Sequence, residues 1–333
     1  MRLIQTLVVR DEADIVDAQI AYHLNAGVDF VIATDHDSQD GTTEILEGYA
    51  RKGCLRLFRE HGEMRESEWR TRMARLAATE YEAGWVINTD ADEFWMPRRG
   101  TLKGAFSALP KHVGIVWALT RHFVPRPDDG DFFADRMTVR FSGSAPLNDP
   151  TSPYRPHAKA AHRADREIVV LFGSHDVRST RLSPLRDWYP ADVLHFPFRS
   201  LAQWEQKGVR RARGDKPLGQ YVRAYDASAT GRASDFYESF VVGHETLTRG
   251  LTDGTLVVDT RLRDVIRSPE RPLPQSAGVD GEAHALVEAA ALREADIVRA
   301  SRRLDVLASR IGAVECRPWA RARVRVGLMG PKR

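Results

Sequence analysis

The sequence predicts an α/β fold, in which a mainly parallel sheet is flanked by helices and followed by a helical region on the C-terminal side. Two observations lead to this prediction. Over the first 120 residues, short apolar runs alternate with amphipathic segments of helical period. A glycine follows each of these amphipathic segments, where it can end a helix. The 333 residues are enough for about two domains, or for one large domain with an appendage.

Each element of this pattern has its own signal. A continuous apolar run is typical of a strand that is covered on both faces. We therefore expect strands at Leu3–Val9, Val28–Thr34, Leu55–Arg59 and Trp85–Thr89. Acidic residues in the first turn, recurring apolar positions and a closing glycine are typical of helices. We therefore expect helices at Asp11–Ala26, Asp40–Lys52 and Ser67–Ala83.

The pattern changes after Leu119. Residues 121–157 are rich in Pro, Asp, Arg and Gly, which predicts an elaborated loop region rather than a linker, because aromatic residues are interspersed. One strand is expected inside it, at Met137–Phe141, and two more beyond it, at Ile168–Leu171 and Asp192–Phe196.

From Ser200 onward the chain is expected to be mainly helical. Residues Ala283–Ile311 have the pattern of an amphipathic helix packed on a core. We expect an α/β domain over residues 1–215, with a first half at 1–120 and a loop-rich half at 121–215. Residues 216–333 would form the helical C-terminal region.

Composition narrows the class of protein. Lys and Arg total 49 against 46 Asp and Glu, a net charge of +3, which gives no support for nucleic-acid binding. Two cysteines cannot form a disulfide framework and fit a reducing compartment. No apolar run approaches the roughly 18 residues of a membrane span. We expect a cytoplasmic protein, with peripheral contact at the inner face of the membrane left open by the basic residues 317–333.

The chemistry is expected where the parallel strands end, because ligands of such sheets bind beyond the carboxyl ends of the strands. Asp90 and Asp92 close the fourth expected strand, and residues i and i+2 of an extended chain point the same way. Two converging carboxylates repel each other, and a hard divalent cation relieves that repulsion. The alternative is a solvated acidic turn that caps the next helix.

The end of the second strand also has two interpretations. Asp35, His36 and Asp37 lie at the strand tip, free to accept hydrogen bonds from a base or a ribose. Asp40 and Thr42 instead suit the turn and cap of the following helix.

The end of the first strand is ambiguous in the same way. Asp11 and Glu12 suit the electropositive N-terminus of a helix. Arg10 beside them can reach a phosphate or pair with one of these acids, and both interpretations stay open.

Taken together, "VVRDEADI", "DHDSQDGT" and "NTDADEFW" resemble the family 2 glycosyltransferases, in particular a bacterial subgroup with the pattern RDEA, DxDSxDGT and DxDEF. The resemblance is clear over residues 1–120 and weaker to about residue 215. It implies the Rossmann-like GT-A fold and a metal-dependent transfer of sugar from a nucleotide-diphosphate sugar to a hydroxyl acceptor. The donor would be a UDP-, GDP- or dTDP-sugar and the cofactor a divalent cation, Mn²⁺ or Mg²⁺.

The resemblance also implies roles for particular residues. Asp90 would face the ribose or the metal, Asp92 would ligate the metal, and His195 would be a third metal ligand. The implied nucleotide-sugar site consists of Val9, Arg10, Asp11, Glu12, Asp35, His36, Asp37, Arg65, Asp90 and Ala91. The chain departs from the family at His36, where members carry an aspartate that contacts the base, so the choice of base stays open.

The catalytic base is less clearly marked. If the enzyme inverts configuration, a carboxylate or histidine must take the proton of the acceptor hydroxyl. The candidates are Asp176, which we favour, and His175, with Asp149 as a further possibility. Retention of configuration also stays open. The cations that follow the expected strand at 192–196 would neutralise the diphosphate: Arg199, Lys207, Arg210 and Arg211.

Two other functions compete with glycosyl transfer. One is a nucleotidyltransferase that makes nucleotide sugars, although the Gly-rich loop typical of that class is missing after the first strand. The other is a non-catalytic nucleotide-sugar-binding module in polysaccharide assembly.

Overall fold

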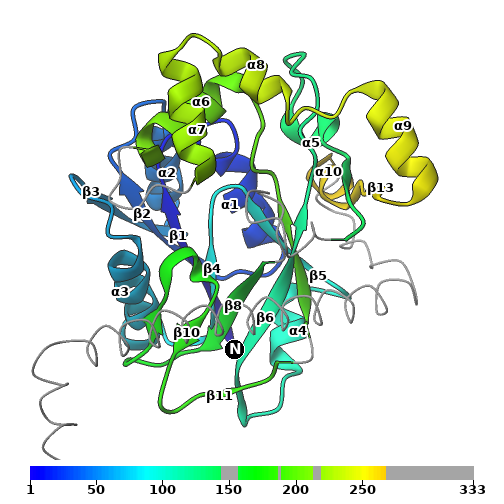
Figure 1. Cartoon of the computed structure of the whole chain (residues 1–333). Coiled ribbons are helices and arrows are strands. Elements are labelled where there is room, and N and C mark those ends of the chain that lie inside the picture. Colours follow the sequence, from blue (N-terminus) through cyan, green and yellow to red (C-terminus); the bar gives the residue numbers. More distant parts are fainter. Residues whose placement is uncertain (144–156, 187–188, 213–218, 268–333) are drawn as a thin grey trace, which may run out of the picture. The chain divides into compact units, whose positions relative to one another are not determined.

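The computed structural model describes residues 1–143, 157–186, 189–212 and 219–267 (Figure 1). The chain divides into two compact units, Met1–Glu288 and Ala289–Arg333, and every described residue belongs to the first. The expected helix Ala283–Ile311, the basic residues 317–333 and Asp149 lie outside the described residues. The domain boundary at residue 215 stays a prediction.

A nine-stranded sheet forms the centre of the described part of the chain. Eight of its strands form a continuous ladder, and the ninth, β11 (Ser183–Pro184), pairs with β6. The order along the ladder is β3 (Leu55–Glu60), β2 (Phe30–His36), β1 (Arg2–Val9), β4 (Ala83–Thr89), β8 (Ala158–Arg163), β6 (Val113–His122), β12 (Ala191–His195) and β5 (Glu93–Pro97).

The direction of the strands decides which residues meet. Strands β1, β2, β3, β4, β6 and β12 run the same way, whereas β8 and β5 run antiparallel to their neighbours. The carboxyl ends of the six parallel strands therefore share one edge of the sheet with the amino ends of β8 and β5. Three residues, Asp90–Asp92, connect β4 to β5, although the ladder between these strands passes through three others, so the sheet curls. The expected mainly parallel α/β sheet is confirmed.

The first three helices follow the predicted alternation with strands. Helix α3 (Glu66–Thr79) packs on β1, β2 and β4, and α2 (Thr42–Arg51) packs on β2 and β3. Helix α1 (Val16–Asn25) packs on α2 and β5. A short helix, α4 (Leu102–Ser107), also packs on β5.

The expected start of the first helix at Asp11 was wrong. Asp11 has a φ of 49°, in the left-handed region, and the helix begins at Val16. The carbonyl of Glu12 accepts hydrogen bonds from the backbone N–H groups of Ile15 and Val16, which closes a turn before the helix. The acids at 11–14 therefore lie in a loop instead of in a helical first turn. This loop is at the carboxyl ends of the parallel strands, the edge of the sheet that we call the functional edge.

The chain beyond β4 contains strands that the sequence analysis did not name. Strand β6 is buried along its whole length, and β5 directly follows the turn Asp90–Asp92. The loop-rich segment holds α5 (Phe133–Arg136), β7 (Val139–Phe141), β9 (Val169–Val170), a 3₁₀ turn η1 (Phe172–Ser174) and β10 (Val177–Arg178).

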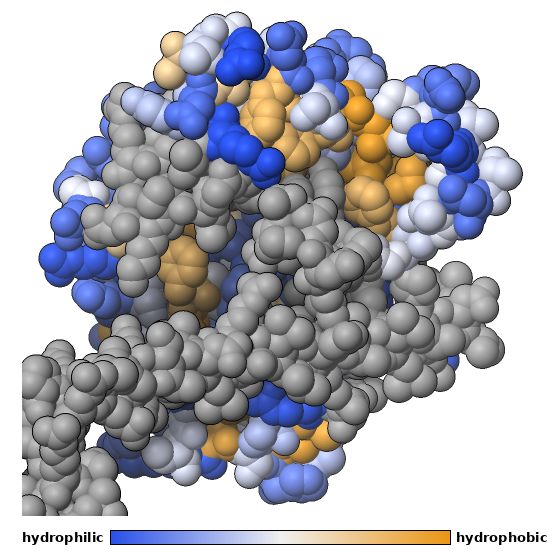
Figure 2. Space-filling model, in the orientation of Figure 1, coloured by the Kyte–Doolittle hydropathy of each residue, from blue (hydrophilic) through white to orange (hydrophobic). Residues whose placement is uncertain are grey.

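The described chain after Ser200 is mainly helical, as expected. It comprises α6 (Leu201–Ala212), α7 (Gly219–Ala229), α8 (Ala233–Glu238), α9 (His244–Asp253), β13 (Leu256–Val258) and α10 (Arg261–Arg267). Strand β13 pairs with β7, which ties this region to the loop-rich segment. Hydrophobic residues gather between α9 and the α6–α8 group, whereas α9 itself is largely hydrophilic on the visible face (Figure 2).

Candidate functional site

Acidic, basic and imidazole groups meet at the functional edge of the sheet. Asp90 follows β4, and Asp92 immediately precedes β5. His122 ends β6 and His195 ends β12, and these two residues are partners in the parallel ladder. Lys159 lies at the start of the antiparallel strand β8.

Three side chains at this edge lie close enough together that they could hold a metal ion. One ligand atom from each of Asp92, Glu93 and His195 lies within 4.8 Å of the others. The backbone fixes this grouping, because His195 is the ladder partner of Glu93 and the N–H of Phe196 donates to the carbonyl of Asp92 at 2.9 Å. Carboxylate oxygens and one imidazole nitrogen suit Mn²⁺, and carboxylates suit Mg²⁺. The residues present therefore fit the divalent cation that the sequence implied.

Asp90, which we expected among the metal ligands, has other partners. Its carboxylate is bonded to the guanidinium of Arg70 and lies 2.7 Å from Nζ of Lys159. Burial opposes ionisation, but Lys159 and Arg70 outweigh it and hold the pKa of Asp90 well below its usual range. Glu93, which we did not predict, lies in the ligand cluster instead, and Asp90 donates its backbone N–H to this carboxylate at 3.1 Å.

Lys159 bridges Asp90 and Glu93, at the two ends of the turn between β4 and β5. Its Nζ lies 2.7 Å from a carboxylate oxygen of Asp90 and 2.7 Å from one of Glu93, and it donates to the carbonyl of Gly173 at 2.8 Å. Burial disfavours the ammonium, but these carboxylates outweigh it and raise the pKa of Lys159 above its usual value. Burial also raises the pKa of Glu93.

Two cations from the segment after β12 lie at the same edge, Lys207 against the turn at Asp92 and Arg199 against the loop after β1. Nζ of Lys207, on α6, lies 2.7 Å from Oδ2 of Asp92 and 3.6 Å from Oε1 of Glu12. Arg199 bonds to Glu12, and its Nε lies 2.6 Å from Oδ2 of Asp14. Burial opposes ionisation of Asp92, but Lys207 and His195 hold its pKa well below the usual range.

The ion pairs at this edge leave an excess of negative charge. Six carboxylates take part among the described residues: Glu12, Asp14, Glu66, Asp90, Asp92 and Glu93. They pair with four cations: Arg70, Lys159, Arg199 and Lys207. With neutral histidines and all six carboxylates ionised, the described part of this network has a formal charge of −2, equal and opposite to the charge of one divalent cation.

His122 adds a contact behind His195. The Nδ1 atoms of these two imidazoles are 3.0 Å apart, and a hydrogen bond between them needs one proton. If Nε2 of His195 is to bind a metal, the proton of this ring must be on Nδ1, and His122 is then the acceptor. His122 is buried, so it holds the ring of His195 in place.

The loops after β1 and β2 are joined by hydrogen bonds. Asp35 is buried, and its carboxylate accepts from Ser38 and from the hydroxyl of Thr43. The prediction that the Asp35 carboxylate is free at the strand tip was therefore wrong. Asp11 accepts from the backbone N–H of Gln39 at 2.6 Å. These contacts fix the shape of the loops, and the nucleotide roles of Asp11 and Asp35 stay predictions.

Asp40 and Thr42 have the structural role that we expected. Oδ1 of Asp40 accepts from the backbone N–H and hydroxyl of Thr42 at 3.1 and 2.6 Å, in the turn before α2. Asp40 also accepts from the backbone N–H of Ala13, which links this turn to the loop after β1.

Most of the other predicted nucleotide-sugar residues are buried, or their side chains already bond to another residue of the protein. Val9 and Ala91 are buried and could contact a ligand through the main chain. Nε of Arg10 lies 3.8 Å from Oδ2 of Asp11, so the pairing interpretation of Arg10 has support. His36 is buried, with Nε2 bonded to the carbonyl of Gly62 at 2.8 Å.

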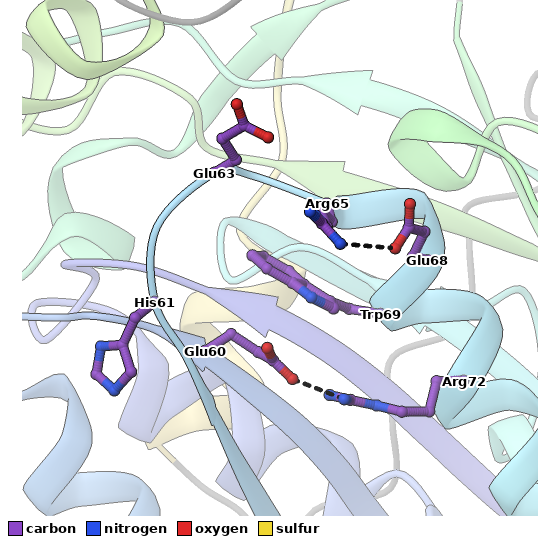
Figure 3. A pocket seen from close by; sticks show the side chains of 7 residues that line it. All are labelled: Glu60, His61, Glu63, Arg65, Glu68, Trp69 and Arg72. Atoms are coloured by element: carbon purple, nitrogen blue, oxygen red, sulfur yellow. Dashed lines mark ion pairs between the residues drawn. The ribbon is translucent and has the colours of Figure 1, made fainter.

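A polar pocket of about 660 Å³ lies beside these loops, at the carboxyl end of β3 and the start of α3 (Figure 3). It contains Arg65, which we expected to contact the nucleotide sugar, and which pairs here with Glu68. The ring of Trp69 lies between this pair and the ion pair of Glu60 with Arg72 (Figure 3). The full lining is Glu60, His61, Glu63, Arg65, Glu68, Trp69 and Arg72.

Asp37 lies beside the same region. It has a φ of 59° and pairs with Nδ1 of His61 at 3.1 Å.

The two candidates for the catalytic base lie in the β9–β10 hairpin. Nδ1 of His175 bonds to the carbonyl of Ala158 at 2.9 Å, beside Lys159, and His175 is exposed. Asp176 accepts the backbone N–H of Val177 at 2.9 Å. The hairpin therefore adjoins the functional edge, and the catalytic roles of both residues stay predictions. The side chains of Arg210 and Arg211 lie outside the described residues.

Six residues of the site were missed in the sequence analysis: Asp14, Glu66, Arg70, Glu93, His122 and Lys159. Glu93 was visible as the next acid after the predicted pair. Lys159 and His122 belong to strands that we did not predict. Arg70 is a buried cation on the core-facing side of α3, which also carries Met73, Ala74 and Ala77. Its helical spacing from these apolar residues was the signal that could have found it.

The fold and this edge define an α/β protein with an acidic site suited to a divalent cation. Within it, residues 4–116 match the sequence model of glycosyltransferase family 92. This match supports a glycosyltransferase, and the expected family 2 subgroup stays a prediction. A search of curated proteins finds no match.

Solved structures give weak similarities. One is TarS of S. aureus, residues 1–349, in complex with UDP, at 14% identity and a TM-score of 0.35, covering 88% of this chain and 92% of that chain. Another is glucosyl-3-phosphoglycerate synthase from Mycobacterium tuberculosis in complex with phosphoglyceric acid, at 17% identity and a TM-score of 0.26, covering 38% and 45%. A third is 4-diphosphocytidyl-2C-methyl-D-erythritol synthase, at 12% identity and a TM-score of 0.28, covering 49% and 75%.

Proposed function

We propose that this protein is a metal-dependent glycosyltransferase that moves a sugar from a nucleotide-diphosphate sugar to a hydroxyl acceptor. The observation that carries the proposal is the cluster of Asp92, Glu93 and His195 at the functional edge. The family match over residues 4–116 includes both carboxylates of this cluster. A divalent cation held there would neutralise charge on the diphosphate leaving group.

The protein's own groups would bind and orient the donor. Asp90 is held ionised by Lys159 and Arg70, so its carboxylate is an acceptor for hydroxyl groups such as those of a ribose. The polar pocket around Arg65 and Trp69 lies next along the same edge and offers both donors and acceptors to a base. Lys207 brings a positive charge to the turn on which the diphosphate would lie.

Transfer forms a bond from the acceptor oxygen to the anomeric carbon of the sugar and breaks the bond from that carbon to the diphosphate. The proton of the acceptor hydroxyl must go to a base. We keep Asp176 and His175 as candidates, because their hairpin contacts Lys159 through the carbonyl of Gly173.

The test is a nucleotide-release assay with UDP-, GDP- and dTDP-sugars in the presence of Mn²⁺. We expect release of one nucleoside diphosphate, and loss of that release in Asp92→Ala. Glu80→Gln is a matched control, because this surface carboxylate lies at the other end of α3 and pairs with Arg56. If folded Asp92→Ala keeps full activity, the metal assignment is wrong.

The same assay distinguishes the alternatives. Release of pyrophosphate from a nucleoside triphosphate and a sugar phosphate would identify a nucleotidyltransferase. Thermal stabilisation by a donor, without turnover over a broad acceptor panel, would identify a binding module. None of the described helices is both long and apolar enough to cross a bilayer. A cytoplasmic location and contact with a membrane surface remain predictions.

A further inference from the structure

Lys207 and His195 converge on one carboxylate oxygen. Nζ of Lys207 lies 2.7 Å from Oδ2 of Asp92, and Nε2 of His195 lies 3.6 Å from the same oxygen. Asp92 is 4% exposed and Lys207 is 15% exposed, so water screens this contact weakly. An ammonium thus lies against a carboxylate of the cluster that would hold the divalent cation.

We propose that Lys207 and the divalent cation exchange at Asp92: Lys207 neutralises this carboxylate in the empty site, and it moves to the donor diphosphate when the cation binds. This inference rests on the proposed function, because it needs the metal site. Two cations that share one buried oxygen repel each other strongly. The cation can therefore take Asp92 fully only if the ammonium leaves.

The position of Lys207 allows such a movement. It projects from α6, outside the sheet, and its charge sits on a flexible stem of four carbons. A second carboxylate oxygen, Oε1 of Glu12, lies 3.6 Å from its Nζ and marks a direction in which the ammonium can turn. Movement to this side keeps Lys207 at the loop after β1.

The neighbouring cations are held differently. Arg199 is bonded to Glu12 and Asp14 and donates to the carbonyl of Phe196 at 3.0 Å. Lys159 is fixed between two carboxylates and a backbone carbonyl. Of these three cations, Lys207 is the one that ion-pairs with Asp92.

The exchange makes binding of cation and donor cooperative. Without a diphosphate, the cation must displace Lys207 from a buried ion pair, which weakens cation binding. With a diphosphate present, the displaced ammonium gains a new anionic partner, and the coupling acts equally in both directions. The device would keep the site from holding a cation tightly before the donor arrives.

The experiment is a titration of the full chain with Mn²⁺, followed by electron paramagnetic resonance of free Mn²⁺, in the absence of nucleotide. Removing the charge in Lys207→Met should tighten Mn²⁺ binding by roughly 10-fold, the equivalent of one lost charge-assisted hydrogen bond. Lys207→Arg retains the charge and should bind Mn²⁺ as the wild type does. Lys103→Met is the matched control, since Lys103 pairs with Asp29 at 2.6 Å on the surface.

A second measurement follows binding of UDP, GDP or dTDP at saturating Mn²⁺. Lys207→Met should bind the nucleotide more weakly than the wild type under these conditions, because the diphosphate loses the cationic partner that the metal has displaced from Asp92. A residue that merely supports the fold would weaken both Mn²⁺ and nucleotide binding. The opposite signs of the two effects are thus specific to the exchange.

If the wild type binds Mn²⁺ and Lys207→Met binds it equally or more weakly, the exchange is wrong while the proposed metal site stands. If neither folded protein binds Mn²⁺, with or without a nucleoside diphosphate, both the metal site and the exchange are wrong.

Discussion

The contacts of Lys159 predict a large loss of stability on its removal. The Lys159→Met variant keeps most of the side-chain volume but removes the ammonium between Asp90 and Glu93, both at 2.7 Å. Asp90 keeps Arg70 and is 32% exposed, so it is partly compensated. Glu93 is 3% exposed and loses its only ion pair among the described residues.

Removing one partner of a buried ion pair typically costs about 3 to 5 kcal/mol, because the other charge is left buried. We expect this loss in the free energy of unfolding at pH 7.5, measured by urea denaturation followed by circular dichroism. Lys103→Met is the control, since its pair with Asp29 is 39% and 28% exposed, and such surface pairs contribute about 1 kcal/mol or less.

The double variant Lys159→Met/Glu93→Gln separates charge from packing. A neutral amide at position 93 no longer leaves a buried carboxylate unpaired, so we expect about half of the loss to be recovered. The reasoning would be refuted if Lys159→Met lost no more stability than Lys103→Met. It would also be refuted if Glu93→Gln added its own full cost to that of Lys159→Met.

Two further predictions concern histidines. His122→Phe removes the acceptor for the Nδ1 proton of His195 and should weaken Mn²⁺ binding by roughly 10- to 100-fold in calorimetric titration. His122→Asn, whose amide oxygen accepts a hydrogen bond, should retain most of the affinity. Equal losses in both variants would contradict this role of His122. Burial lowers the pKa of His23 from 6.5 to about 4, so the unfolded chain binds a proton between these values and the folded chain does not. His23 alone should therefore lower stability by about 2 kcal/mol on acidification from pH 7 to pH 5, and His162, whose pKa burial also lowers to about 4, should add a similar loss. Urea midpoints over this range provide the measurement, and a His23→Gln variant with an unchanged pH dependence would show that another group is responsible.

The N-terminal half of the fold was predictable because local signals and tertiary contacts agree there. Apolar runs of the right length gave β1 to β4, and closing glycines gave the ends of α1 and α2 within a few residues. The parallel arrangement then predicted that polar strand ends meet at one edge. The pairing of Asp92 with His195 was implied by the family resemblance, and the antiparallel pairing of β12 with β5 brings the two residues together.

The rest of the site depends on strand direction, which no local pattern reveals. Lys159 and Glu93 lie at the amino ends of antiparallel strands, whereas the search for candidate residues followed the carboxyl ends of parallel ones. Asp90 looked equivalent to Asp92 in the sequence. The two aspartates differ because Arg70 and Lys159 approach one and Lys207 and His195 approach the other.

The position of β12 between β6 and β5 has a consequence for how the protein matures. Strand β5 is synthesised early, directly after Asp92, but its only ladder partner among the described strands is β12, which leaves the ribosome much later. Until then, the nascent chain carries an unpaired strand edge beside carboxylates that lack His195 and Lys207, which makes it vulnerable to mispairing. Strand β12 both closes the ladder between β6 and β5 and supplies His195 to the ligand cluster. The capacity to bind Mn²⁺ would thus report on nascent chains that have finished folding, since a chain truncated before Ala191 contains Asp92 and Glu93 but cannot bring them to a histidine of β12.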